Sequence, residues 1–493
     1  MTQKEKKERQ SIMNFNKHDF SRIIINDVLS YKGGRAFLKK YKQSEVREIV
    51  EGYRSEANQD KLVEISRLLY AKSPQYKRLV NYFSGMALFS HILSPIKDIQ
   101  KVRSDLVLKQ YSDIGELTRM MNLRHEMTKV LKVAFREDVF YGYIFKEEKS
   151  FYIQPISPSI CKITSIDEVY NFSIDMTYFT IREKELKAYA SEISDKYFQW
   201  KTKKKLNSQV SDWVELDSKN TICIKINEET SNVFPPFAGS FDSIYDVEGF
   251  KQLRKDKEEL ANYMVITQHL PIREDSEDNN DFLIDEDMMT YFHSQAVDAV
   301  PENVGVITSP MKVEALKFER DKADSDGVLR AERDLWSGLG VSQLLFNADK
   351  TTSEGLKASI KTDEQIVFNV LNQIQRWLNR YLKYQFNDLF FNVSILPVTY
   401  FNRQEMFDMY IMAGQYGVPV KSAISAVVGL DPIEVMNMAY LENDLLKMHD
   451  EFIPLQSSHT MSGDDPNSES GRPKKDPSEE SDETARGRDK ANA

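Results

Sequence analysis

Carboxylate side chains gather in one short stretch of this sequence. Between residues 275 and 287 they are Asp275, Glu277, Asp278, Asp281, Asp285, Glu286 and Asp287. Oxygen ligands of this kind could hold a hard cation, or could attract a basic partner. The same composition is typical of a solvated, exposed segment, and the sequence leaves these alternatives open.

Other chemical motifs begin in this sequence but are not completed. "GLKAS" at Gly355 lacks the G-x-x-x-x-G-K-[ST] spacing of a phosphate-binding loop, and Gly338 and Gly340 have no third glycine after them. "HEMTK" starts like a zinc-protease helix but has no second His four residues on, so we expect His125 to be an ordinary helix residue. We therefore expect no catalytic residue, no metal and no cofactor.

Composition excludes several classes of protein. The 493 residues suffice for several domains, 41% hydrophobic residues can form cores, and 29% charged residues indicate a large solvated surface. No apolar run approaches the roughly 18 to 20 residues of a membrane span, and "MTQKEKKERQ" lacks the apolar region of a secretory signal. Two cysteines are too few for a disulfide framework, so the chain is compatible with a reducing cytoplasm. The net charge of -10 argues against tight wrapping of nucleic acid, but not against a wall past which nucleic acid slides.

The elements of the first half predict a mixed α+β domain. Apolar residues three and four apart predict helices through 44–57, 60–93 and 115–142, and Ser73 before Pro74 is a typical helix start. Short aromatic and β-branched segments between 141 and 227, including "VYNFSIDMTYF" and "KYFQWK", predict antiparallel strands.

A helix, a small insertion and a second helix are expected next. Asp242 or Ser243 could cap the first helix, which Pro271 ends, and the second runs from about Asp321 to Ser337. The insertion contains the acidic stretch and then short strands near "GVITSP" and "KVEALKF".

A polar loop then joins the second of these helices to a long one. The loop within "GLGVSQLLFNADKTTSEGLKASIKTDEQI" is longer than a helical bundle needs. The long helix has one apolar face, formed by Ile360, Val367, Val370, Leu371, Ile374, Trp377, Leu378 and Leu382. A strand at "NVSILPVTYF" and two or three short helices from Arg403 follow, and the tail from about Gln456 is expected to be disordered.

This order of parts resembles the portal proteins of tailed bacteriophages. The resemblance is carried by "LYAKSPQYKRLVNYFSGM", "DLWSGLGVSQLLFN" and "SEGLKASIKTDEQIVFNVLNQIQRWLNRYL", and it is greatest to portals of long-tailed phages of Gram-positive hosts. It covers most of the chain, and the ending "SGRPKKDPSEESDETARGRDKANA" resembles the polar C-termini of such portals. It implies a predominantly α-helical α+β subunit with no enzyme activity, which assembles into a ring, usually dodecameric, at one capsid vertex.

The resemblance also implies a division of the chain. The expected parts are an N-terminal arm with the first helices (1–50), an α+β wing (51–240), a first stem helix (241–269), a clip (270–318), a second stem helix (319–342), a tunnel loop (343–354), a long wing helix with a strand (355–402), a helical crown (403–455) and a disordered acidic and polar tail (456–493).

Site residues follow from this division. The tunnel loop would bring Asn347, Lys350, Thr351, Thr352 and Ser353 near passing double-stranded DNA, although Ser353 could equally be the N-cap of the long helix. Few cations and no interleaved aromatics suit sliding, because tight binding would stall the DNA. Candidate channel-lining stem residues are Asp321, Lys322, Asp324, Asp326, Arg330 and Glu332, and candidate clip residues for binding the terminase or the connector are Asp281, Asp285, Glu286 and Asp287.

The partners implied are further copies of the chain in a ring, double-stranded DNA, the terminase large subunit, head-completion or adaptor proteins, and the major capsid and scaffolding proteins. The location implied is the portal vertex of the virion, and the host cytoplasm during assembly. Two other hypotheses stay open at this point. One is a metal-dependent nucleic-acid enzyme that uses Asp285 or Asp287, and the other is a cytoplasmic adaptor or scaffold that binds partners through its amphipathic helices.

Overall fold

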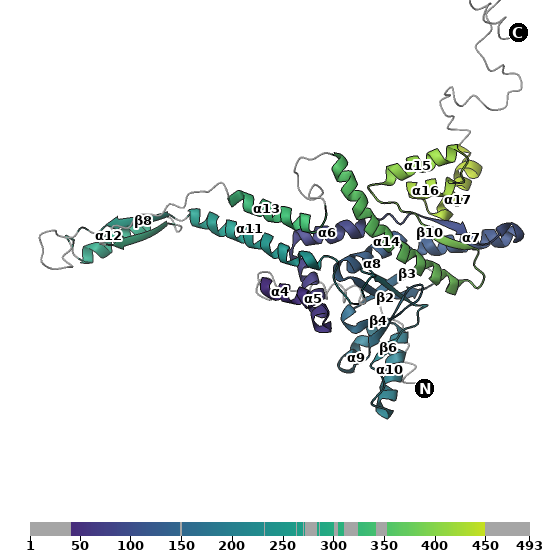
Figure 1. Cartoon of the computed structure of the whole chain (residues 1–493), viewed down its shortest axis with the longest axis horizontal. Coiled ribbons are helices and arrows are strands. Elements are labelled where there is room, and N and C mark those ends of the chain that lie inside the picture. Colours follow the sequence, from purple (N-terminus) through teal and green to yellow (C-terminus); the bar gives the residue numbers. More distant parts are fainter. Residues whose placement is uncertain are drawn as a thin grey trace, which may run out of the picture. The chain divides into compact units, whose positions relative to one another are not determined.

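The fold is mixed α+β and mainly helical, as predicted. The computed structural model describes residues 41–147, 150–230, 232–262, 264–269, 271, 283–284, 286–299, 304–309, 324–341 and 353–448 (Figure 1). The chain divides into two units, residues 1–435 and 436–493. The predicted tail, 456–493, lies outside the described residues.

Helices dominate the described start of the chain: α4 (Gln43–Glu51), α5 (Glu56–Lys72), α6 (Pro74–Gly85), α7 (Ser104–Met121) and α8 (Leu123–Glu137). Ser73 caps α6 as predicted, because its side chain accepts a hydrogen bond from the Tyr76 N–H. The single helix predicted over 115–142 is wrong. Asn122 adopts a left-handed conformation (φ 44°, ψ 59°) that separates α7 from α8, and Asp138 (φ 75°) ends α8. Asn and Asp tolerate positive φ better than most residues, which explains both breaks.

A central antiparallel sheet follows, in the order β3 (Phe151–Ile156), β2 (Val139–Lys146) and β7 (Thr221–Lys225). Side chains alternate across a strand, so each face of this sheet meets a different core. Phe140 and Ile144 of β2 enter the larger core, while Val139, Tyr141 and Tyr143 enter the smaller one. Burial on both faces explains the almost continuous apolar sequence of β2.

The smaller core is closed by a second antiparallel sheet and short helices. The strands are β4 (Cys161–Ile166), β5 (Tyr170–Asp175) and β6 (Trp213–Glu215), and the helices include α9 (Tyr178–Ile181) and α10 (Ser191–Leu206). The predicted strand at "KYFQWK" is wrong, because this segment lies in α10, and the end of "VYNFSIDMTYF" forms α9. Ile193, Tyr197 and Trp200 are spaced by four and three residues, so a helix buries all of them on one side.

The helix pair and its insertion differ in part from the prediction. The first helix, α11 (Phe241–Asn262), ends before β8 (Met264–His269), so it does not continue to Pro271. The reason is that β-branched residues of β8 pair in parallel with β9 (Val304–Ser309), in register from Met264 with Val304 to His269 with Ser309. The insertion therefore begins within the range predicted as stem. It also contains α12 (Glu286–Ala299), which was not predicted.

The second helix of the pair is α13 (Asp324–Gly338), which packs along α11 (Figure 1). The strand predicted near "GVITSP" is confirmed as β9, whereas "KVEALKF" lies outside the described residues.

The long helix, α14 (Ser353–Gln385), is confirmed, and every residue of its predicted apolar face is buried. It docks on the edge strand β7, where the Gln373 amide accepts from the Lys225 N–H (2.8 Å) and donates to the Lys225 carbonyl (2.9 Å). Trp377 Nε1 donates to the Thr221 carbonyl (3.0 Å). These bonds satisfy edge groups that would otherwise be buried without partners.

The predicted strand after α14 is β10 (Phe391–Ile395), which pairs with β1 (His91–Pro95) in antiparallel orientation. The predicted short helices are α15 (Arg403–Gln415), α16 (Lys421–Val428) and α17 (Pro432–Tyr440). A third apolar cluster joins Leu396 and Val398 to Ala423, Ala426 and Val427 of α16. In the second unit, the described residues include a π-helical turn, Leu441–Leu445.

Two further predictions concern cysteines and membranes. Cys161 and Cys223 are buried free thiols. No single helix within the described ranges is long and apolar enough to cross a membrane; Lys421–Val428 and Pro432–Leu445 pass that test only when taken together.

Candidate functional site

The predicted tunnel loop is described at its two ends. Asn347, Lys350, Thr351 and Thr352 lie outside the described residues. Ser353 is the first residue of α14, so it lies inside the helix and neither in the loop nor ahead of the helix as its N-cap. Glu354 is exposed in the first turn, where a negative charge interacts favourably with the helix dipole.

The chain enters the loop from a fixed position. Leu335, Trp336 and Val341 are buried in the larger core, which also contains Val367 of α14. Two residues after the end of α13, Gly340 has φ +68°, and its N–H donates to the Ser337 carbonyl (3.1 Å). Glycine adopts this conformation without strain. The core therefore holds the last described residue before the loop.

The chain leaves the loop through the first half of α14, where two neighbouring carboxylates are buried. The Tyr82 hydroxyl donates to Asp363 (3.0 Å), and the Thr399 hydroxyl donates to Glu364. Burial raises the pKa of Asp363 to about 6 and also raises the pKa of Glu364. These bonds tie α14 to α6 and to the segment after β10.

A cavity of about 630 Å³ lies between the residues that precede the loop and the middle of α14. Its lining includes Gly338 and Val341 from the end of α13, Asp363 and Gln373 from α14, and Lys225 from β7. Lys225 is already neutralised, because its ammonium group donates to Asp138 and to the Asn232 carbonyl (2.9 Å). Lys225 in the lining is thus a paired cation, and Asp363 accepts from the Tyr82 hydroxyl, so we assign no reaction to the cavity.

The candidate stem residues separate into different environments. Asp321 and Lys322 lie outside the described residues, and Asp324 and Asp326 lie in the first turn of α13. Arg330 is exposed. Glu332, in contrast, is largely buried in the helix pair, where it meets Lys251 Nζ of α11 (3.6 Å) and accepts from Gln75 Nε2 (3.1 Å). Glu332 therefore joins helices within one chain.

The candidate clip residues are described in part. Asp281 and Asp285 lie outside the described residues, while Glu286 and Asp287 begin α12, and Asp287 is exposed. Sequence reasoning missed the apolar face of α12, formed by Met288, Tyr291 and Phe292. Their spacing of three and four residues could have revealed an amphipathic helix, but the acidic composition around them obscured it.

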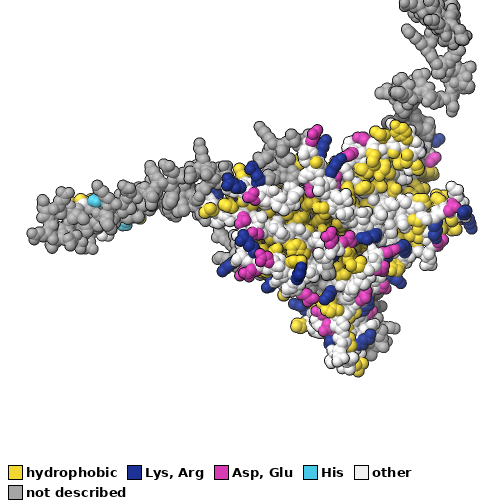
Figure 2. Space-filling view, viewed as in Figure 1, with side chains coloured by type: hydrophobic (Ala, Val, Ile, Leu, Met, Phe, Trp, Pro, Cys, Tyr) yellow, Lys and Arg dark blue, Asp and Glu magenta, His cyan; other side chains and the backbone are white. Residues whose placement is uncertain are grey.

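Exposed apolar residues were also missed on the helices after Arg403. Met409, Met412 and Tyr416 are 49%, 59% and 84% exposed. Figure 2 shows apolar side chains gathered over the region of α15 and α16. An exposed apolar patch of this kind is typical of a surface that another protein covers.

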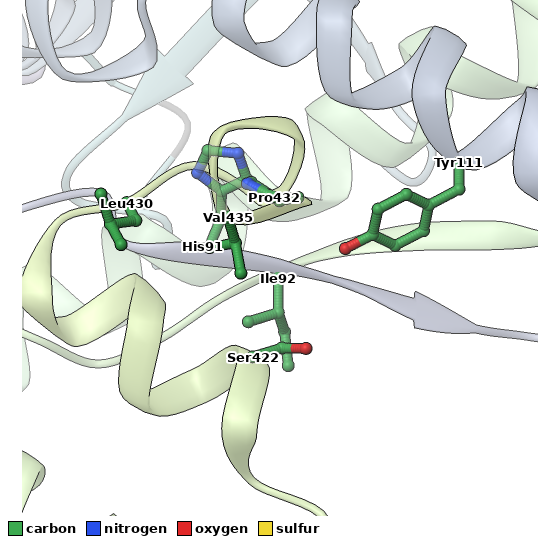
Figure 3. A pocket seen from close by; sticks show the side chains of 7 residues that line it. All are labelled: His91, Ile92, Tyr111, Ser422, Leu430, Pro432 and Val435. Carbon is green, nitrogen blue, oxygen red and sulfur yellow. The ribbon is translucent and has the colours of Figure 1, made fainter. Parts of the chain in front are cut away.

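A small cavity of about 20 Å³ lies between β1 and the short helices α16 and α17 (Figure 3). His91 lines it, with Tyr111 of α7 and Ser422 of α16. The His91 ring bonds to the Phe89 carbonyl through Nδ1 (3.1 Å), whereas Nε2 has no hydrogen-bond partner among the described residues. The cavity has room for one water molecule. Burial lowers the pKa of His91, and Asp431 partly opposes this shift.

No group of three or more His, Cys, Asp or Glu side chains that could hold a metal ion occurs in the described part of the chain. The acidic stretch that suggested a cation site lies mostly outside that part.

No family model and no curated protein matches the chain. Among solved structures, it is similar to a chain of "Neck of empty GTA particle computed with C6 symmetry", with a TM-score of 0.40 and 13% identity over 75% of this chain and 94% of that one. It is also similar to a chain of "Virion of native gene transfer agent (GTA) particle", with a TM-score of 0.42 and 12% identity over 78% of this chain and 99% of that one.

Proposed function

We propose that the chain is the portal subunit of a tailed phage or phage-like particle. Copies would form a ring at one capsid vertex, through which double-stranded DNA enters during packaging and leaves during ejection. The insertion would dock the terminase and, later, the head–tail connector proteins. The observation that carries this proposal is the continuous succession of α11, an insertion, α13, a polar loop and α14. This succession is the one that the resemblance to portals implies.

The packing around the loop supports a role in a channel. Buried Trp336 and Val341 hold one end, and the buried face of α14 holds the other, so the loop is attached at both ends to the larger core. In a ring, symmetry would multiply a single short loop into a constriction. Lys350, Thr351 and Thr352 offer one cation and small hydroxyls, which suit weak, exchangeable contacts with phosphates.

The exposed apolar residues support assembly into a larger structure. Leu253 of α11 and Leu329 of α13 are 48% and 55% exposed in the single chain. Covering such residues with neighbouring copies would remove apolar surface from water at about 25 cal/mol per Å².

Electron microscopy of the purified full chain tests the ring. We expect closed rings with an axial hole, and class averages viewed down the axis would give the number of subunits. A chain that sediments as a monomer at every concentration tested would contradict the proposal.

A deletion tests the loop. Removing residues 346–351 spares Val341 and Ser353, so we expect rings to form normally while particles retain less nuclease-protected DNA. Truncation at residue 470 is the matched control, because it removes polar residues far from the loop in sequence, and we expect it to leave packaged DNA unchanged. Normal DNA retention in the loop deletion would exclude the channel role of the loop.

A further inference from the structure

The outer face of α12 is apolar. Met288, Tyr291 and Phe292 are 50%, 55% and 45% exposed and lie three and four residues apart, on the same side of the helix as Gln295. Gln295 Nε2 donates to the Tyr291 hydroxyl (2.9 Å), and the Tyr291 and Phe292 rings meet edge to face at 5.9 Å. His293 and Ala296, which lie on another side of the helix, are half-buried.

This exposure is costly for so small an element. A helix of 14 residues is marginal in water unless a face is packed, and here Met288, Tyr291 and Phe292 are exposed. Tyrosine and other aromatic residues contribute most of the binding energy in many protein interfaces. The Tyr291 ring is also held by Gln295, so less freedom is lost when a partner covers it.

Charge selects the kind of partner. Residues 274–311 hold ten Asp and Glu and no Lys or Arg, which equals the net charge of -10 of the whole chain, so the remaining residues are balanced. On α12 itself, Asp287 and Asp298 are exposed near the two ends of the apolar face. A second copy of the same insertion would bring like charges together, whereas a surface rimmed with Lys and Arg would be attracted.

We propose that this face of α12 binds a different protein, through an apolar pocket that takes Tyr291 and Phe292 and is rimmed by Lys or Arg. The aromatic side chains provide the affinity, and the surrounding carboxylates speed association and exclude acidic partners. The proposal deepens the docking role proposed above for the insertion, and rests on that function in assigning the partner to packaging or to the head–tail connection. The surface itself requires no ring.

Peptide binding to the full chain tests the proposal. The probe is a fluorescein-labelled amphipathic helix with Leu on one face and Lys on the other, and its partner peptide has Glu in place of every Lys. Fluorescence anisotropy should show that the chain binds the Lys peptide at least tenfold more tightly than the Glu peptide. The double variant Tyr291→Ser/Phe292→Ser keeps the charge unchanged, and we expect it to bind the Lys peptide about tenfold or more weakly, which is roughly 1.4 kcal/mol or more.

Two controls define the result. Tyr416→Ser removes an even more exposed aromatic residue elsewhere and should leave binding unchanged. Met288→Gln/Phe292→Gln is a milder second variant, which should also weaken binding while the melting transition stays unchanged. If both α12 variants bound the Lys peptide as tightly as the wild type, the proposal would be overturned, because charge alone would then account for binding. A change in sedimentation without a change in peptide binding would overturn it too, since a second copy would then cover the face.

Ring formation is measured in the same samples, which separates this proposal from the proposed function. Rings that do not distinguish the two peptides would overturn the docking face alone. A chain that binds the Lys peptide as expected but forms no ring would support the docking face and contradict the portal.

Discussion

At the scale of the residue, Gly142 occupies a point in β2 where a side chain does not fit. A Cβ there would lie 2.6 Å from the Phe140 ring and 2.7 Å from Ile153 Cγ2. We expect Gly142→Ala to destabilise the fold by about 1 to 3 kcal/mol, because the packed neighbours must move. Gly85→Ala is the control, since nothing lies within 4 Å of its Cβ position, and it should leave thermal unfolding unchanged or slightly raise the midpoint. Equal midpoints for both variants would contradict the packing.

His91 gives the fold a dependence on pH. Burial lowers its pKa, so the folded chain keeps the imidazole neutral under conditions in which the unfolded chain, with a pKa of about 6.5, takes up a proton. The contribution of His91 to the stability of the fold is thus fully present above about pH 6.5, and it is lost as the pH falls toward the lowered pKa. We expect the melting temperature to fall more steeply from pH 7.5 to 5.5 in the wild type than in His91→Gln.

Comparing the wild type with His91→Gln cancels the effects of the other titrating groups, which both proteins share. Asp363, with a pKa raised to about 6, acts in the opposite direction, because its contribution is lost as the pH rises through 6, but it is present in both. Parallel pH curves for wild type and His91→Gln would show that His91 is solvated in the folded chain.

At the scale of the element, long periodic segments were predictable and local breaks were not. The apolar face of α14 extends over many turns, so its burial could be predicted from the spacing of its residues alone. The break between α7 and α8 depends on one residue, Asn122, whose left-handed conformation leaves no periodic signal. Whether the α10 segment forms a helix or a strand depends on tertiary packing, because its aromatic residues suit both. The site residues stay a prediction, although the sequence did not reveal that Glu332 joins helices or that α12 has an exposed apolar face.

A buried ion pair holds the elements around β7. Lys225 and Asp138 have side chains 1% and 0% exposed, and Asp138 also accepts from the Asn227 (2.9 Å) and Phe234 (3.1 Å) N–H groups. Lys225→Met leaves a buried carboxylate without its cation, so we expect a loss of about 3 to 5 kcal/mol in chemical denaturation. In the matched control, Lys383→Met removes an ion pair with Glu168 in which both side chains are 53% exposed, and the change should stay within about 1 kcal/mol. Similar losses of unfolding free energy for the two variants would mean that burial does not determine how much an ion pair contributes to stability.

At the scale of the whole molecule, exposed apolar residues on α11 and α13 are candidates for the contacts between subunits in the proposed ring. Leu253 and Leu329 lie on helices that pack together, and Phe250 beside them is 43% exposed. Because a ring places the same helices of every copy in the same position, one apolar contact would be repeated at each interface. A small change in one subunit is then multiplied around the ring.

We therefore expect Leu253→Ser/Leu329→Ser to prevent or weaken ring closure while the melting transition of the subunit is preserved. Serine removes apolar contact without adding charge, and both positions are solvent-facing in the single chain, so folding has little to lose. Sedimentation velocity should show smaller species in place of rings at equal concentration.

Ile181→Ser is the control, because Ile181 is 93% exposed on α9, away from the helix pair, and rings of this variant should persist. If the double variant closed into rings as readily as this control, the contacts between subunits would have to lie on other elements, and the apolar residues around Met412 and Tyr416 would be the next to substitute.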